Sequence, residues 1–160
     1  MKKVIYIACS LLLLGCSDKT DELSDAEQLQ KDSVIIDKWL AENAVTTLSD
    51  PSGLRYTITL EGTGVKPALT NKVTVKYTGK FLKEGVTPAN SGVFDQATVA
   101  VTFDLASLIA GWQIGFQLLP KGSKATLYIP SGLAYGKSGA GSSVPANANL
   151  FFEVELIDVK

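Results

Sequence analysis

The sequence predicts an α+β domain in which one curved antiparallel sheet packs against one short helix, with an amphipathic helix preceding it. The first observation is a set of four segments in which apolar and polar residues alternate, as they do in half-buried antiparallel strands. These segments are residues 54–60, 72–79, 123–129 and 150–159. The second observation is an apolar stretch, residues 105–118, which is predicted as the helix of the domain. The third is the helical spacing of apolar residues within residues 24–43.

The chain begins with the pattern of a secretory signal. Lys2 and Lys3 precede an apolar run that is shorter than the about 20 residues of a membrane-spanning helix. The run ends with LLGC at residues 13–16, which resembles the lipobox of bacterial lipoproteins, in which cleavage precedes the cysteine and its thiol is then acylated. Residues 1–15 are therefore predicted to be a lipoprotein signal peptide, and a lipid on Cys16 is predicted to anchor the protein to a membrane.

The composition excludes several kinds of chemistry. The formal net charge is −1 and no basic stripe is visible, so nucleic acid is not an expected partner. The chain has no histidine, Cys9 leaves with the signal and Cys16 is acylated, so histidine triads, Cys-His dyads and the usual zinc sites are excluded. We therefore expect neither a metal nor a cofactor. The 46% apolar content is ample for one core, and residues 16–160 have the size of a single domain.

A polar spacer and a helix separate the signal from the main domain. Residues 16–23 are predicted to be a flexible tether, and Ser24 and Glu27 have the spacing of a capping box. The apolar stripe that follows consists of Leu29, Ile35, Ile36, Trp39 and Leu40. This helix either lies on its own domain, acts as a spacer or mediates dimerisation. A turn rich in proline and glycine separates the segment 24–48 from the main domain, residues 49–160.

Four blocks of the main domain resemble successive signatures of one known family. They are VKYTG at 75–79, FD at 94–95, and the stretches 108–136 and 144–159. In this order they resemble the FKBP-type peptidyl-prolyl isomerases. The resemblance implies a twisted antiparallel half-barrel wrapped round one short helix, with an apolar cleft that takes a proline. It also implies that proline-containing peptides or unfolded proteins are the clients, and that macrolide inhibitors such as rapamycin bind in the cleft.

The resemblance implies a role for each residue of the cleft. Trp112 is implied as the floor on which the proline ring lies, although an aromatic residue here is equally a core residue. The backbone N–H of Ile109 and the hydroxyl of Tyr135 are implied as donors to bound peptide. Asp95, by default a solvated turn residue, is implied as a polar contact near the substrate amide. The implied catalytic residues are Tyr77, Phe94, Asp95, Trp112 and Tyr135, and the implied substrate-binding residues are Leu108, Ile109, Phe103, Phe152 and, at the tip of a loop over the cleft, Val144.

The sequence departs from the family's pattern ahead of the predicted helix. Residues 96–97 are Gln-Ala where the family usually has two serines, the turn at 84–93 is longer than usual, and the stretch leading to Phe103 is shorter. Val101 and Phe103 therefore compete for one position on the inner wall of the cleft, and the sequence leaves this choice open.

The function implied is peptidyl-prolyl cis-trans isomerisation, which assists the folding of exported proteins in the cell envelope. Rotation about an Xaa-Pro bond faces a barrier of about 18–20 kcal/mol and needs no proton transfer, so a site without histidine suffices. Two alternatives stay open: a non-catalytic prolyl-peptide binding or chaperone module on a lipid anchor, and an interaction factor that acts through the helix at 25–43. Ser17, which follows Cys16, favours the outer membrane of a Gram-negative bacterium.

Overall fold

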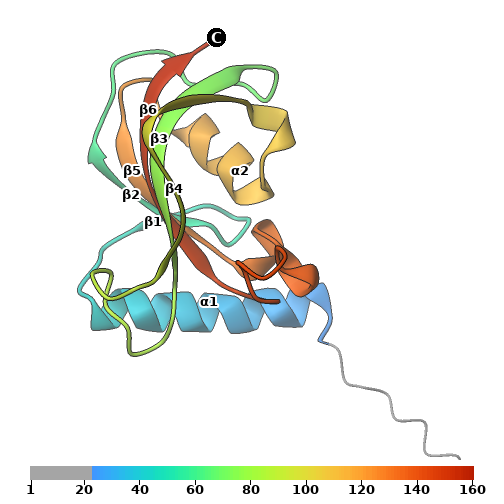
Figure 1. Ribbon diagram of the computed structural model, residues 1–160. Coiled ribbons are helices and arrows are strands. Elements are labelled where there is room, and N and C mark those ends of the chain that lie inside the picture. The colour runs from blue at the N-terminus through green and yellow to red at the C-terminus, as the bar shows by residue number, and fades with distance from the viewer. Residues whose placement is uncertain (1–22) are drawn as a thin grey trace, which may run out of the picture.

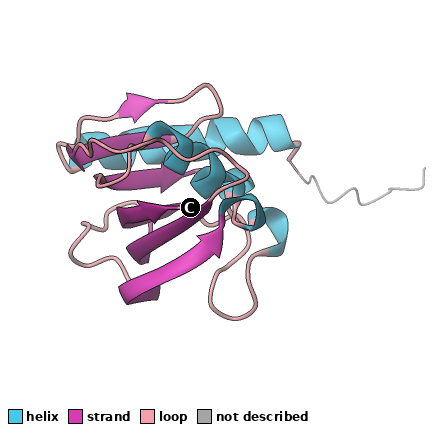
Figure 2. Ribbon diagram, turned by 90° about the horizontal axis from the view of Figure 1, so that it is seen from above, coloured by secondary structure: helices cyan, strands magenta, loops and turns pink. Residues whose placement is uncertain are grey.

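Six strands form one antiparallel sheet with a helix against each of its faces (Figure 1). The computed structural model describes residues 23–160. The elements are the helices α1 (Asp25–Glu42) and α2 (Ala110–Leu118), the 3-10 turns η1 (Leu105–Ser107), η2 (Ser131–Leu133) and η3 (Gly136–Ser138), and the strands β1 (Leu48–Ser49), β2 (Arg55–Leu60), β3 (Lys72–Phe81), β4 (Val93–Asp104), β5 (Lys124–Ile129) and β6 (Leu150–Val159). The strand order is β1-β2-β5-β6-β3-β4, and the strands are turned relative to one another as in a twisted sheet (Figure 2). The predicted α+β class is confirmed.

The helix α2 lies very close to strand β5 because two glycines face the sheet. A Cβ atom on Gly111 would lie 2.5 Å from Cγ2 of Ile129, and one on Gly115 would lie 2.7 Å from Cδ1 of Leu127. Both sheet residues are fully buried, so neither can move aside. The glycines stand four residues apart and so share one face of α2. They let the helix backbone approach the sheet, which explains why a glycine directly precedes Trp112.

The helix α1 covers the other face of the sheet at one end (Figure 1). Tyr128 of β5 and Phe151 of β6 point away from α2, and their rings lie 5.9 and 5.3 Å from the ring of Trp39. Ile36 is fully buried in the same cluster. The predicted capping box is confirmed, because the N–H of Ser24 donates to the Glu27 carboxylate at 2.9 Å while the Ser24 hydroxyl accepts from the N–H of Glu27. The apolar stripe of this helix therefore lies on its own domain.

The helix α1 also holds the long connection between β3 and β4. The indole N–H of Trp39 donates to the carbonyl of Val86 at 2.6 Å, and Lys38 forms an ion pair with Glu84. Within the connection, the hydroxyl of Ser91 donates to the carbonyl of Thr87 at 3.1 Å. The turn predicted to be longer than usual is therefore tied to a helix on the outer face of the sheet.

Three strands or helices differ from the sequence prediction, of which the first is the two-residue strand β1, in a stretch predicted to be linker and turn. Strand β4 was not predicted, because it is an edge strand whose residues are mostly exposed and show no clear alternation. The predicted helix at 105–118 is wrong at its start: Leu105–Ser107 form the turn η1, Leu108 and Ile109 are extended, and α2 begins only at Ala110. The apolar spacing continues through this break, so periodicity alone did not reveal it.

The predicted signal peptide, the lipobox-like stretch and Cys16 lie outside the described residues. Within residues 23–160, no helix is both long enough and apolar enough to cross a membrane.

Gly111→Ala is expected to destabilise the domain by about 1–3 kcal/mol, the usual cost of overpacking a core, although alanine favours a helix. Urea unfolding would measure the free energy of unfolding. Gly132→Ala is the matched control, because no atom lies within 4 Å of the added Cβ and the change is expected to be neutral or slightly stabilising. Equal losses in the two variants would contradict the close approach of α2 to the sheet.

Candidate active site

A cavity of about 260 Å³ opens between α2, the segment that leads into it, and the inner face of the sheet. Its lining residues come from strands β3, β4 and β6, from η1, from the extended segment between η1 and α2, from α2 itself and from the segment after η2. They are Tyr77, Asp95, Phe103, Ser107, Leu108, Ile109, Trp112, Tyr135 and Phe152. The volume lies just below the roughly 300–1,000 Å³ typical of pockets for drug-sized ligands, so the cavity suits one small ring.

Trp112 forms a flat base with aromatic rings nearly perpendicular to it. The rings of Tyr77, Phe103 and Phe152 meet the indole at interplanar angles of 83°, 78° and 84°. Their centroids lie 5.0, 6.3 and 5.2 Å from that of the indole, within the range of favourable T-shaped pairs. The arrangement gives an apolar pocket that is closed on several sides by rigid groups.

The indole nitrogen of Trp112 is buried and has no hydrogen-bond acceptor among the described residues. Leaving a buried donor unpaired costs roughly 1–3 kcal/mol, and native proteins do so at few positions. The unpaired N–H of Trp112 therefore lowers the stability of the folded domain. Such a cost is more typical of a functional site than of a core optimised for packing.

The segment that leads into α2 presents a free backbone donor at the cavity. Ile109 is the N-cap residue of α2, and its carbonyl accepts from the N–H groups of Trp112 and Gln113. No backbone carbonyl of the described residues accepts from the N–H of Ile109. The side chain of Gln113 donates to the carbonyls of Leu108 and Ala106 at 2.7 and 3.1 Å, which fixes the segment. Gln113 was not predicted from the sequence, where its only signal is its position one turn after Ile109.

A carboxylate and two phenols form the polar part of the cavity. The hydroxyl of Tyr77 donates to Oδ2 of Asp95 at 2.8 Å. Burial, together with this hydrogen bond and the negative charge of Asp95, raises the pKa of Tyr77 to about 12. Burial, and then the charge of Asp95, also raises the pKa of Tyr135. Both phenols therefore keep their protons at neutral pH and can act as hydrogen-bond donors.

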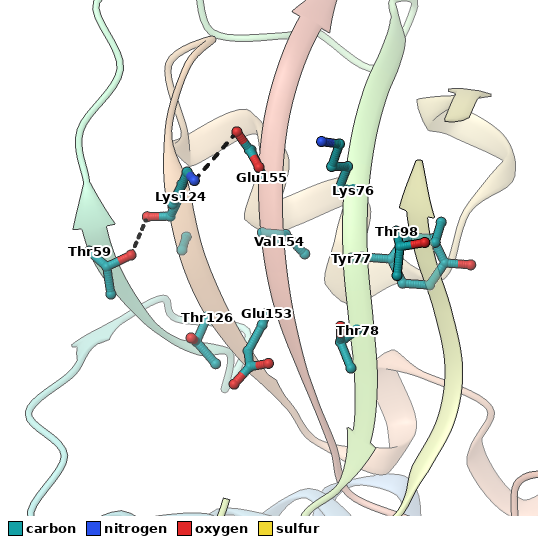
Figure 3. A pocket seen from close by; sticks show the side chains of 12 residues that line it. Thr59, Lys76, Tyr77, Thr78, Thr98, Lys124, Thr126, Glu153, Val154 and Glu155 are labelled. Carbon is teal, nitrogen blue, oxygen red and sulfur yellow. Dashed lines mark hydrogen bonds and ion pairs between the residues drawn. The ribbon is translucent and has the colours of Figure 1, made fainter. Parts of the chain in front are cut away.

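A larger hollow of about 530 Å³ lies on the outer face of the sheet (Figure 3). It is lined by threonines and by charged residues, among them Lys124 and Glu155, whose charged groups are 3.6 Å apart. Its aromatic lining residue, Tyr77, has its ring packed against Trp112, so the hollow itself has no aromatic base. The smaller cavity over Trp112 is the better candidate for a site that binds an apolar ring.

Comparison with known proteins fits this geometry. The family model of the FKBP-type peptidyl-prolyl cis-trans isomerases matches residues 63–157, more than half of the chain. The chain belongs to this FKBP family. The matched range contains every residue that lines the cavity.

Two relatives and one solved structure illustrate how this FKBP family member compares with others. FkpA of Aeromonas hydrophila, an FKBP-type peptidyl-prolyl cis-trans isomerase, is 45% identical over 148 residues, which are 89% of this chain and 53% of that protein. Outer membrane protein MIP of Legionella longbeachae is 39% identical over 113 residues, 69% of this chain and 46% of that protein. The chain thus spans about half the length of these relatives. The structure of a peptidyl-prolyl cis-trans isomerase from Pseudomonas syringae pv. tomato has a TM-score of 0.69 and 32% identity, with 87% of this chain and 98% of that chain covered.

The FKBP-like fold brings together most of the residues singled out in the sequence. Those that line the cavity are Tyr77, Asp95, Phe103, Leu108, Ile109, Trp112, Tyr135 and Phe152. Both competing wall residues pair with β3, Phe103 with Val73 and Val101 with Val75, but of the two only Phe103 lines the cavity. Ser107 also lines the cavity and was missed, although it directly precedes the block that carried the resemblance.

Phe94 and Val144 are not brought into the lining of the cavity. Phe94 packs behind the wall, with its ring 5.1 Å from that of Phe81 and 5.6 Å from that of Phe152. Val144 is only 3% exposed and pairs with Ala140 in an isolated bridge, so its side chain joins the core. The two residues support the cavity from outside its lining.

Trp112→Leu is expected to weaken the binding of a proline-containing peptide by about tenfold or more, a loss of about 1.4 kcal/mol, because the flat base is gone. Titration calorimetry would measure the affinity, and circular dichroism would establish that the variant is folded. Phe116→Leu is the control, because Phe116 is fully buried 5.1 Å from Trp112 and does not line the cavity. Full affinity in a folded Trp112→Leu protein would contradict the assignment of the base.

Asp95→Val is expected to lower the pKa of Tyr77 from about 12 towards its ordinary value near 10, because a hydrogen bond and a negative charge are removed. Phenolate absorbance in an alkaline titration would measure this pKa. Between about pH 10 and about pH 12, Tyr77 keeps its proton in the folded protein and loses it in the unfolded chain. The free energy of unfolding therefore falls as the pH rises through this range, and the pH range over which it falls is expected to be narrower in Asp95→Val.

The same Asp95→Val variant is expected to lose turnover with little change in melting temperature, since Asp95 is exposed. Asp104→Val, in the same strand but outside the cavity, is the control for a change of charge. A large fall in melting temperature for Asp95→Val alone would make Asp95 a structural residue instead.

Proposed function

We propose that this FKBP family member catalyses cis-trans isomerisation of Xaa-Pro bonds in proline-containing peptides and unfolded proteins. The observation that carries the proposal is the cavity over Trp112, with three aromatic rings nearly perpendicular to its indole. A pyrrolidine ring is compact, apolar and small enough for such a cavity. The membership of the family and the names of the relatives support the same activity.

Isomerisation requires the enzyme to favour a twisted amide over a planar one. The barrier of about 18–20 kcal/mol arises from amide resonance, and each tenfold acceleration requires about 1.36 kcal/mol of preference for the twisted state. The planar amide is the more charge-separated form, because its nitrogen is conjugated with the carbonyl. An apolar cavity solvates that form poorly, so binding there lowers the barrier without any proton transfer.

The polar groups of the cavity hold the two sides of the rotating bond. The N–H of Ile109, which has no backbone acceptor among the described residues, would hold the peptide carbonyl that follows the proline. The hydroxyl of Tyr135 would donate to the peptide, and the carboxylate of Asp95 would lie near the rotating amide. Fixing one side of the bond while the other turns is a positioning effect, for which rigid groups are suited.

A non-catalytic prolyl-peptide binding or chaperone module is the second candidate. The observation that favours it is the altered region ahead of α2, where the long β3–β4 connection is tied to α1 and Phe94 lies behind the cavity wall. Such a module would keep the affinity for proline-containing peptide and lose the rate enhancement.

The proposed place of action is the cell envelope, with a lipid on Cys16 as the membrane anchor and the outer membrane as the site of attachment. The signal-like residues 1–15, the LLGC stretch and Ser17 support this proposal. A relative whose name is outer membrane protein MIP supports it as well. Isomerisation of Xaa-Pro bonds takes tens to hundreds of seconds uncatalysed, so exported chains that arrive unfolded would benefit from such an enzyme.

Exchange NMR on a short Ala-Xaa-Pro peptide tests the activity. We expect the chain to accelerate cis-trans exchange, and rapamycin, proposed to bind over Trp112, to abolish the acceleration. No acceleration by a folded chain that still binds the peptide would favour the non-catalytic module. Acceleration that persists in the presence of bound rapamycin would place the activity outside this cavity.

Cys16→Ala tests the anchor. The variant is expected to leave the membrane fraction and to lose incorporation of a labelled fatty acid, because a lipid chain provides most of the membrane affinity. Cys9→Ala, in the same apolar run, is the control and should keep the label. Membrane association that survives without any label in Cys16→Ala would overturn the lipid anchor.

A further inference from the structure

The helix α1 carries a buried carboxylate on the side that faces the domain. Asp32 is only 1% exposed, and no ion pair found within residues 23–160 includes it. Its Oδ2 atom accepts from the N–H of Ser131 at 2.9 Å and from the hydroxyl of Ser131 at 2.6 Å. Its Oδ1 atom accepts from the side-chain amide of Gln28 at 2.7 Å. Aspartate is rarely so buried, and here neutral donors alone satisfy it.

The partner of Asp32 is the first residue of η2, the turn that leads to the active-site cavity. Ser131 is fully buried, and its N–H is shared with Oδ1 of Asn149 at 3.0 Å. The turn continues with hydrogen bonds from the N–H of Leu133 to Pro130 and from the N–H of Ala134 to Ser131. The next residue is Tyr135, which lines the cavity. A short hydrogen-bonded turn therefore connects Ser131, which is held by the carboxylate of Asp32, with the phenol of Tyr135.

Docking of α1 does not by itself require a buried carboxylate. Its apolar residues, Ile36, Trp39 and Leu40, already pack against Tyr128 and Phe151 on the outer face of the sheet. Apolar contacts are not directional, whereas the two hydrogen bonds from Ser131, one from its backbone N–H and one from its hydroxyl, fix the position and direction of that residue, and the bond from Gln28 orients the carboxylate itself. Functional groups are held in productive geometry by such a supporting set of hydrogen bonds.

We propose that Asp32 is a positioning residue, which fixes the start of η2 and thereby places the hydroxyl of Tyr135 in the cavity. The inference rests on the proposed isomerase function of that cavity. Asp32 touches neither the cavity nor its contents, so its effect passes entirely through Ser131 and the turn.

The test compares three variants of the full chain in detergent. Asp32→Ala removes the carboxylate that holds Ser131, and kcat/KM is expected to fall about fivefold to tenfold. Misplacing a catalytic group by about 1 Å can lower the rate by up to about 100-fold. Asp32→Asn keeps an oxygen for Ser131, and the amide of Gln28 can turn to suit it, so near wild-type activity is expected. Ile36→Ala weakens the docking of the same helix without touching Ser131, and should lower the melting temperature at unchanged kcat/KM.

A spectroscopic readout separates placement from stability. With fluorotyrosine incorporated, the ¹⁹F resonance of Tyr135, assigned through Tyr135→Phe, should shift or broaden in Asp32→Ala and stay in place in Ile36→Ala. In the Tyr135→Phe background, Asp32→Ala should cause no further fall in kcat/KM. If Asp32→Ala does not fold, Ser131→Ala removes one of the three hydrogen bonds and is expected to give a smaller effect of the same kind.

Two results would overturn the inference while leaving the isomerase function intact. One is wild-type kcat/KM and an unchanged Tyr135 resonance in folded Asp32→Ala. The other is an equal loss of activity in Asp32→Ala and Ile36→Ala, which would mark Asp32 as merely structural. If the wild-type chain shows no isomerase activity, the proposed function fails, and the Tyr135 resonance still decides whether Asp32 places the phenol.

Discussion

The close approach of α2 to β5 is the constraint on which the rest of the domain depends. Gly111 and Gly115 let the helix backbone lie against the side chains of Ile129 and Leu127. At this distance the helix buries the indole of Trp112 under the curve of the sheet, where aromatic rings from three other places in the chain surround it. A larger spacing would lift the indole, open the cavity and expose the core behind it. Packing and binding are therefore not alternatives for Trp112, because one geometry serves both.

The sequence revealed those strands that have one buried face. In β3, and in β6 from Phe152 onward, buried residues alternate with more exposed ones, and this pattern can be recognised in the sequence alone. The sequence of β4 shows no such pattern. Because β4 is an edge strand with little burial on either face, its residues need not alternate between apolar and polar. The start of α2 was misjudged for the opposite reason. Leu108 and Ile109 are apolar because they line the cavity, and their spacing happens to continue that of the helix.

The residues of the site were found through the resemblance more than through periodicity. Aromatic residues and Asp95 stand in recognisable blocks, so most of the cavity could be named in advance. The burial of Val144 could not, because the direction of a side chain in a loop depends on a single bridge to Ala140. Asp32 could not be found either. A polar residue within an apolar stripe looks like an interruption of the pattern until the donors that satisfy it are known.

The bond between Trp39 and Val86 has a consequence for how such domains diverge. The long β3–β4 connection depends on a helix that lies dozens of residues before it in the chain, because the indole N–H of Trp39 in that helix has its acceptor in the connection. Trp39 is almost fully buried, so its indole N–H depends on the carbonyl of Val86 for an acceptor. In evolutionary terms, α1 and the β3–β4 connection form one heritable unit. Recombination that separates them leaves the indole N–H of Trp39 unpaired and the connection without its contact to the helix. Variation in the helix and in the connection is best understood jointly, as the history of a single feature.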